Sequence, residues 1–402
     1  MADNQPDGRL IPVEFKPQMP DTLLQFASDL REYFHRYDGR CPDVAPHGEL
    51  PFEELAMRLF ALQHAANPAY RTECDGLGIT PDAVRDWRSI PAMPAAAFKV
   101  LDLSSVPSSM RTRVFRSSGT TGHTASRHVH SADSLALYES SLWPWFRRHL
   151  LPMPGAGLPT IGAGPGRILS LTPPGRDVPG SSLVHMIETV MERAGSADGW
   201  TCPAFLGTLD SAGGWILRVD AVLQSLTAAV DGGHPVMLLG TAFNFVHLIE
   251  ACDAAGCRVT LPAGSRLMET GGYKGRSRAV SRTELLSDLT RILGIPSEGM
   301  VGEYGMSELS SQAYDAVAGV GGARVFRFPP WARARIVSVE TGRDVEEGET
   351  GLLRIVDLAN VWSVMAIQTE DLAVRCGTGF QLAGRAPAAE ARGCSLRSAG
   401  EN

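Results

Sequence analysis

The sequence predicts an α/β protein in which mostly parallel sheets are flanked by helices and a small β subdomain follows. Between residues 167 and 305, short apolar runs typical of strands alternate with longer runs whose apolar residues recur at helical spacing. This alternation is typical of a mostly parallel sheet. After about residue 323, apolar and polar residues alternate between turn residues, which indicates a small antiparallel sheet.

The individual elements follow from the same patterns. In the N-terminal part, helices are expected over residues 21–37, 51–66 and 131–150, with Ser131 as the N-cap of the last, and a short strand over 112–118. Further along, strands and helices are expected to alternate over residues 167–172, 181–194, 235–241, 243–256, 257–264, 282–294 and 299–305.

Three parts are expected on this basis. A helix-rich segment covers residues 1–95, and an α/β core covers residues 96–323. A small β subdomain covers residues 324–396 and ends in a hinge and a tail that carries a cysteine.

Composition excludes several classes of protein. The 402 residues carry 37 Lys and Arg against 44 Asp and Glu, a net charge of −7, which argues against a nucleic-acid binder. A membrane span and a secretory signal are not expected, because the chain lacks a long apolar run and a basic start before an apolar segment. The seven scattered cysteines include no CxxC pair, which fits reduced thiols in a cytoplasmic protein.

The segment "SSGTTG" at residues 117–122 is the first candidate site. Small residues allow successive backbone N–H groups to turn toward one point, and hydroxyls add donors, which suits phosphate oxygens. The pattern is not a Walker A loop, because no lysine follows the second glycine. An ordinary turn is the alternative interpretation. The residues in this segment are Ser117, Ser118, Gly119, Thr120, Thr121 and Gly122.

The segment "EYGMSEL" is the second candidate site. It follows a strand-like run and places Tyr304, Gly305, Ser307 and Glu308 close together. The Glu308 carboxylate could hold Mg²⁺ through one oxygen, since Mg²⁺ usually takes one or two carboxylates together with phosphate oxygens. The alternative is a helix start with a glutamate in its first turn.

A third candidate site lies near the C-terminus. Asp371 is expected to end a strand-like run, where its carboxylate could accept ribose hydroxyls, and Arg385 is a candidate phosphate or ribose partner. The alternatives are a turn aspartate and a surface arginine.

The three segments in this order resemble the adenylate-forming superfamily, which includes acyl-CoA synthetases, luciferases and peptide-synthetase adenylation domains. The resemblance implies the N-terminal domain fold of those enzymes. It implies that the loop from Ser117 to Gly122 grips the phosphates of ATP and that Tyr304 stacks on adenine. Ser307 and Glu308 are then expected to serve phosphate and Mg²⁺.

The same resemblance assigns the C-terminal candidates. It implies that Asp371 binds ribose and that Arg385, at the hinge, contacts the nucleotide. Gly305 belongs to the same nucleotide-binding motif.

A narrower resemblance is to the LuxE-type acyl-protein synthetases. It depends on the segments above and on "LLGTAF" (238–243), "TGGYKGR" (270–276), "DLAN" (357–360) and "RGCSL" (392–396). It implies that Gly271 and Gly272 help to bind the nucleotide. It also implies that a carboxylic acid, with a fatty acid as the expected substrate, is activated as acyl-AMP and that the acyl group is then transferred to Cys394. The onward acceptor is expected to be a partner such as an acyl reductase or a carrier protein.

A thiolate is a good acyl acceptor, and Arg392 could lower the pKa of the Cys394 thiol. The alternative is a free thiol near the chain end, and Cys376 is a weaker candidate acceptor. The C-terminal lid domain of larger adenylate-forming enzymes is expected to be lacking, together with its catalytic lysine. Lys274 is the candidate replacement, with Arg276 second, and a solvated loop lysine is the alternative.

The sequence therefore predicts an ATP- and Mg²⁺-dependent, AMP-forming ligase that makes a thioester. Two other functions stay open. One is an acyl- or aryl-CoA ligase, and the other is a carrier or regulatory protein that binds nucleotide or acyl groups without turnover.

Overall fold

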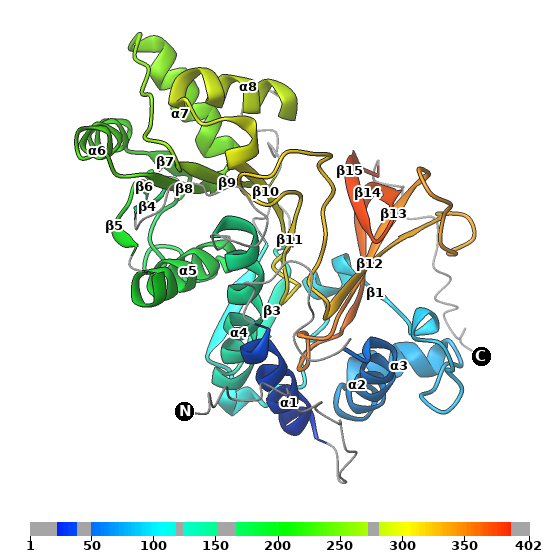
Figure 1. The fold of residues 1–402 in the computed structure, drawn as a ribbon. Coiled ribbons are helices and arrows are strands. Elements are labelled where there is room, and N and C mark those ends of the chain that lie inside the picture. The colour runs from blue at the N-terminus through cyan, green and yellow to red at the C-terminus, as the bar shows by residue number, and fades with distance from the viewer. Residues whose placement is uncertain are drawn as a thin grey trace, which may run out of the picture.

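A computed structural model (Figure 1) describes residues 22–37, 50–117, 124–151, 166–198, 200–271 and 281–386. Its central sheet has six strands in the order β11-β10-β9-β8-β4-β5. All neighbours pair in parallel except β10 and β11. The strands are Ala313–Tyr314 (β11), Met300–Tyr304 (β10), Arg266–Thr270 (β9), Val236–Thr241 (β8), Arg167–Ser170 (β4) and Thr201–Phe205 (β5).

Helices cover both faces of the six-stranded sheet, and its central strands are therefore buried on both sides. Met237 and Leu239 of β8 pack in one apolar cluster with Met186, whereas Leu238 packs in another with Phe245. Figure 1 shows α5 on one side of the sheet and α7 and α8 on the other. The helices are Ala132–Leu150 (α4), Ser182–Asp198 (α5), Val219–Asp231 (α6), Ala242–Ala254 (α7) and Arg282–Leu293 (α8).

A second sheet lies beside the first and is mostly antiparallel. Its strands run in the order β1-β14-β13-β12, with β15 also paired to β14, and only β1 pairs in parallel. The strands are Met93–Pro94 (β1), Ala332–Val337 (β12), Thr350–Asp357 (β13), Ala366–Cys376 (β14) and Gly379–Arg385 (β15). The smaller sheet therefore takes one strand from far upstream in the chain.

Two hairpins and several short helices complete the described structure. The hairpins pair Arg113–Arg116 (β2) with Arg127–His130 (β3), and Gly207–Leu209 (β6) with Trp215–Leu217 (β7). The N-terminal helices are Leu23–Arg36 (α1), Phe52–Ala66 (α2) and Pro68–Gly76 (α3). Short 3-10 helices span Trp87–Ser89, Ala95–Lys99, Ser108–Met110 and Ser297–Gly299.

The α/β fold with a small β region is as predicted, and two local expectations are wrong. Residues 257–264 form no strand. The backbone N–H groups of Val259 and Leu261 instead donate to the last carbonyls of α8, Ile292 and Leu293, and the strand begins later, at Arg266. Asp371 lies inside β14 rather than at a strand end, because the strand continues to Cys376 in its pairing with β15.

Helix α4 confirms its predicted start. Ser131 is the N-cap, and its hydroxyl accepts from the backbone N–H of Ser134, while the Ser134 hydroxyl accepts from the N–H of Ser131. This reciprocal pair satisfies two N–H groups that a helix start would otherwise leave unbonded. The predicted division at residues 95 and 323 stays a prediction.

A buried glutamine ties α2 to the turn after β13. The Gln63 amide donates to the carbonyls of Asn360 (2.7 Å) and Val361 (3.2 Å) and accepts from the N–H of Met365 (3.0 Å). Gln63 is fully buried, so water does not replace these partners. The N-terminal helices thereby hold the segment 357–365 in place.

Replacing this glutamine is expected to destabilise the fold. Gln63→Met keeps much of the volume but leaves buried backbone groups unbonded, which should lower the free energy of unfolding by about 3 kcal/mol. Urea unfolding measures the change. The matched control is Gln25→Met, because Gln25 is exposed on α1 and its side-chain amide donates to Asp29 of the same helix. Equal, small effects of the two substitutions would contradict this role of Gln63.

Candidate active site

The three sequence-predicted residues Tyr304, Asp371 and Arg385 meet between the two sheets. The Tyr304 hydroxyl at the end of β10 donates to Oδ2 of Asp371 on β14 at 2.8 Å. Nε of Arg385 on β15 bonds to the other oxygen, Oδ1, at 3.1 Å. The Asp371 side chain is 14 % exposed and that of Arg385 is 73 % exposed, so the aspartate is a fixed acceptor and the arginine reaches into solvent.

Aromatic packing fixes the Tyr304 ring. Phe326, Phe328 and Phe380 meet it edge to face, with the Phe380 ring centroid 5.5 Å away at an interplanar angle of 86°. Burial, and then the neighbouring Asp371 carboxylate, raises the pKa of Tyr304 well above its usual value. The hydroxyl therefore stays protonated and donates to Asp371.

A second group of polar side chains joins the "SSGTTG" region to the "YGMSEL" segment. The backbone N–H of Ser126 donates to the Ser117 hydroxyl at 3.0 Å, and the hydroxyls of Ser126 and Ser307 lie 3.3 Å apart. The Ser307 hydroxyl donates to Oε2 of Glu308 at 3.0 Å. Residues about 180 positions apart are thus brought together, with the Glu308 carboxylate at the end of the group.

His128 on β3 holds the same segment through a hydrogen bond to its backbone. Its Nδ1 donates to the Ser307 carbonyl at 2.9 Å, which is the only role that the carbonyl oxygen permits. Burial lowers the pKa of His128 to about 4, although the bond to Ser307 opposes this effect. The imidazole is therefore neutral near pH 7 and acts as a structural donor.

Two residues of "DLAN" hold the backbone that follows Glu308. The Asp357 carboxylate accepts from the N–H of Ser310 (2.9 Å) and the hydroxyl of Ser311 (2.7 Å). Nδ2 of Asn360 donates to the Glu308 carbonyl at 2.8 Å. In the sequence this segment is informative only through its resemblance, because no local pattern shows which distant backbone groups a buried aspartate binds.

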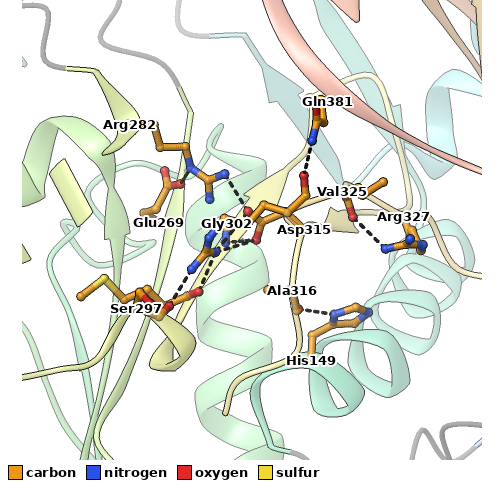
Figure 2. Close-up of polar contacts among 12 residues, drawn as sticks. His149, Glu269, Arg282, Ser297, Gly302, Asp315, Ala316, Val325, Arg327 and Gln381 are labelled. Carbon is orange, nitrogen blue, oxygen red and sulfur yellow. Dashed lines mark hydrogen bonds and ion pairs between the residues drawn. The ribbon is translucent and has the colours of Figure 1, made fainter. Parts of the chain in front are cut away.

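A largely buried ionic network lies on the face of β10 that carries Gly302 (Figure 2). Arg282 at the start of α8 bonds to Glu269 (2.7 Å) and pairs with Asp315 (2.6 Å), and Asp315 also accepts from the N–H of Gly302 (2.7 Å). A Cβ on Gly302 would overlap the Arg282 guanidinium, so a larger residue at this strand position would displace that side chain. Arg324 adds a second cation at 3.2 Å from Asp315. The network fixes the strand that carries Tyr304.

Sequence reasoning missed a functional candidate, the buried carboxyl of Glu303, which lies directly before Tyr304 in the "EYGMSEL" segment. Glu303 is 7 % exposed, and its Oε2 accepts a short hydrogen bond from the Thr270 hydroxyl at the end of β9. Burial raises the pKa of Glu303 to about 7, against the effect of that bond. A Cβ on Gly305 would overlap Glu303 Oε1, so the carboxyl folds back against this glycine. The only available signal was a charged residue inside a strand-like run.

The remaining predicted residues divide into two sets. Gly271 follows Thr270 directly and has a φ of 74°, a conformation that favours glycine. The others lie outside the described residues, namely Ser118, Gly119, Thr120, Thr121, Gly122, Gly272, Lys274 and Cys394. Within the described ranges, no helix is long and apolar enough to cross a membrane.

Comparisons with known proteins test the family resemblance that the sequence predicts. The sequence model of the acyl-protein synthetase family LuxE matches residues 209–400. The chain is also 22 % identical over 350 residues to a long-chain-fatty-acid–luciferin-component ligase of Vibrio harveyi, which covers 82 % of each protein. The predicted resemblance to LuxE-type acyl-protein synthetases is therefore confirmed.

Solved structures of adenylate-forming ligases share the fold. An open 2-hydroxyisobutyryl-CoA ligase in complex with 2-HIB-AMP and CoA aligns with a TM-score of 0.55 at 14 % identity, over 83 % of this chain and 74 % of that chain. The same ligase in its thioesterification state gives a TM-score of 0.55 at 16 % identity, over 83 % and 67 %. The predicted fold class is confirmed.

Asp371 is expected to dominate nucleotide affinity. Asp371→Ala removes the acceptor that Tyr304 and Arg385 hold in place, and we expect ATP to bind about 10- to 100-fold more weakly, as for the loss of a hydrogen bond to a charged group. Isothermal titration with ATP measures this change. The control is Asp344→Ala, which also removes an arginine-paired aspartate of the smaller sheet, at 2.8 Å from Arg335. Unchanged ATP affinity in Asp371→Ala would contradict the site.

Glu303 is expected to make stability depend on pH. Its pKa is raised from 4.5 in the free side chain to about 7 in the folded protein, so the folded state binds more protons between these values. The free energy of unfolding should therefore fall by about 3 kcal/mol through this group as the pH rises from about 5 to about 8. Glu303→Gln should lose less stability over that range in urea unfolding. Parallel pH dependence of the two proteins would contradict the buried carboxyl.

Proposed function

We propose that this ligase of the LuxE acyl-protein synthetase type activates a carboxylic acid with ATP and keeps the acyl group as an enzyme thioester. One observation carries the proposal most directly. Asp371 is held by Tyr304 and Arg385 at the junction of the two sheets, and Glu308 lies in the segment that begins one residue after Tyr304. An acceptor for ribose, an aromatic ring and a carboxylate thus gather at the carboxyl end of β10.

The first step forms the acyl-adenylate. An oxygen of the substrate carboxylate attacks the α-phosphorus of ATP, the bond to the bridging oxygen breaks, and pyrophosphate leaves. Asp371 would orient the ribose through its free lone pairs, and Arg385 would reach the phosphates from solvent. The hydroxyls and amides of residues 117–122 would bind phosphate oxygens, and Lys274 would supply the cation near the reacting carboxylate. Adenylation of this kind depends mainly on positioning and charge neutralisation.

The Glu308 carboxylate fits a magnesium ion. It is buried and oriented by the Ser307 hydroxyl, and one carboxylate oxygen with phosphate oxygens is a common set of Mg²⁺ ligands. When bound there, Mg²⁺ would neutralise charge on the phosphates. Ser307 would keep the Glu308 carboxylate in the required orientation.

The second step transfers the acyl group. The thiolate of Cys394 attacks the acyl carbon of the mixed anhydride, a thioester forms, and AMP leaves with the electron pair of the broken bond. We propose a fatty acid as the substrate, in line with the name of the Vibrio harveyi relative. A partner protein, such as an acyl reductase or a carrier protein, would then accept the acyl group from Cys394. The reaction would take place in the cytoplasm.

Intact-protein mass spectrometry tests the proposal. The chain is incubated with ATP, Mg²⁺ and a panel of carboxylic acids, and an ATP-dependent acyl adduct that hydroxylamine removes is expected. Cys394→Ser should lose the adduct and still release pyrophosphate, because adenylation precedes the transfer. Cys376→Ser is the matched control and should keep the adduct.

Each alternative predicts a different result. An adduct that survives in Cys394→Ser but not in Cys376→Ser would move the acceptor to Cys376. Pyrophosphate release without any adduct, together with acyl transfer to added coenzyme A, would indicate a CoA ligase. Nucleotide binding without pyrophosphate release for every acid would indicate a carrier or regulatory protein.

A further inference from the structure

Two cysteines lie together where α7 ends. Cys252 is in the last turn of the helix, and Cys257 is in the segment that follows it. The Cys252 side chain is fully buried, and Cys257 is partly buried against the same apolar cluster. Both are free thiols, and the proposed mechanism uses neither of them.

The turn that ends α7 brings these two side chains into contact. The backbone N–H of Cys257 donates to the carbonyl of Cys252 at 2.9 Å, and the N–H of Gly256 donates to the carbonyl of Asp253 at 3.1 Å. Gly256 has a φ of 61°, a left-handed conformation that glycine adopts readily. These features define a Schellman motif, in which the two residues joined by the outer hydrogen bond frequently touch through their side chains. Both of those residues are cysteines in this protein.

The two thiols act on each other. Burial, and then a hydrogen bond with the Cys257 thiol, raises the pKa of Cys252 to about 12. Cys252 is therefore held as a neutral thiol, and Cys257 is the sulfur that a dissolved oxidant reaches first. Cys202 on β5 differs, because its thiol donates to the carbonyl of Met191 at 3.1 Å.

Contacts with α8 hold the turn on both sides. Arg291 of α8 binds both carboxylate oxygens of Asp253, at 2.7 Å and 3.0 Å. After the turn, the N–H groups of Val259 and Leu261 donate to the last carbonyls of α8 at 2.8 Å and 3.0 Å. The backbone around the two cysteines is thus fixed, which keeps their thiols close together in the folded protein.

We propose that Cys252 and Cys257 are an oxidation site, a dithiol that a peroxide converts into an intrachain disulfide. The Cys257 thiolate attacks one oxygen of hydrogen peroxide, the O–O bond breaks, and hydroxide leaves, which produces a sulfenic acid. The deprotonated Cys252 sulfur then attacks the Cys257 sulfur, the S–O bond breaks, and a second hydroxide leaves. The two thiol protons turn both hydroxides into water, so two electrons pass from the dithiol to the peroxide.

This site is independent of the proposed ligase chemistry. Helix α7 begins at Ala242, directly after β8, so the two cysteines lie at the opposite end of the helix from the carboxyl edge of the sheet. Figure 1 shows α7 beside α8 on one side of that sheet. The test therefore measures the state of the two thiols and does not depend on ligase activity.

Peptide mass mapping of the full chain tests the proposal. The protein is treated with hydrogen peroxide and unfolded, and free thiols are alkylated with N-ethylmaleimide. Trypsin then releases both cysteines in one peptide, residues 219–258, because no lysine or arginine lies between them. We expect this peptide to take up maleimide at both cysteines before oxidation and at neither afterwards. It should also lose two hydrogen atoms, and dithiothreitol should restore both thiols.

Three variants separate the two cysteines from the rest of the chain. Cys257→Ser should leave Cys252 as a thiol that is still alkylated after peroxide treatment. Cys252→Ala should leave Cys257 as a sulfenic acid that dimedone labels, because no second thiol resolves it. Cys202→Ser is the matched control, since it removes another partly buried thiol, and it should form the same disulfide. Melting temperatures show that each variant is folded.

Several results would overturn the proposal. These are continued alkylation of both cysteines in the oxidised wild type, oxidation of Cys257 without a link to Cys252, and a disulfide between two copies of the chain. Hydrogen exchange adds an independent readout, because a bridge within the native turn should slow exchange in the last turn of α7. Faster exchange throughout α7 would mean that the bridge forms only in an unfolded helix, which also contradicts the proposal.

Discussion

The buried carboxylate of Asp357 is the contact on which the candidate site depends. It ends β13 of the smaller sheet, is fully buried, and accepts from the N–H of Ser310, the hydroxyl of Ser311 and the N–H of Ala359. Burial raises its pKa to about 6, although these hydrogen bonds oppose the change. One side chain of the antiparallel sheet thus fixes the segment that leaves the parallel sheet. This contact holds the backbone that directly follows Glu308.

Further buried contacts surround this one. Asn360 holds the Glu308 carbonyl, and Gln63 on α2 holds the Asn360 carbonyl in turn. On the other side, His128 holds the Ser307 carbonyl from the hairpin β2–β3. The turn after β13 and the hairpin β2–β3 therefore contact this segment directly, and α2 acts on it through Asn360. Such a junction is where ligand sites form in α/β proteins, outside the carboxyl ends of parallel strands.

The sequence predicted which residues gather at the candidate site better than it predicted the framework that holds them. Tyr304, Ser307, Glu308, Asp371 and Arg385 could be found because their motifs are local and keep a fixed order. The structure brings Tyr304 and Asp371 together although they are 67 residues apart. Motif order predicted that proximity only through the resemblance, because sequence spacing alone does not define which strands of two sheets face each other.

The contacts of Asp357 and Glu303 could not be predicted for the same physical reason. A buried carboxyl looks like any other charged residue until the strand register shows which donors it faces. The run at 257–264 is the opposite case, because its local pattern predicts a strand that does not form. Its β-branched residues favour a strand, but carbonyls at the end of α8 take up the N–H groups of Val259 and Leu261. Tertiary hydrogen bonding outweighed the local preference.

The central claim is that acyl-adenylate lies between β10 and β14. The most direct measurement is a crystal structure with a non-hydrolysable acyl-adenylate, an acyl sulfamoyl adenosine. The account predicts the adenine against Tyr304 and the ribose hydroxyls on Asp371. Binding of the analogue at another place in the chain, with Asp371 still bonded only to Tyr304 and Arg385, would contradict it.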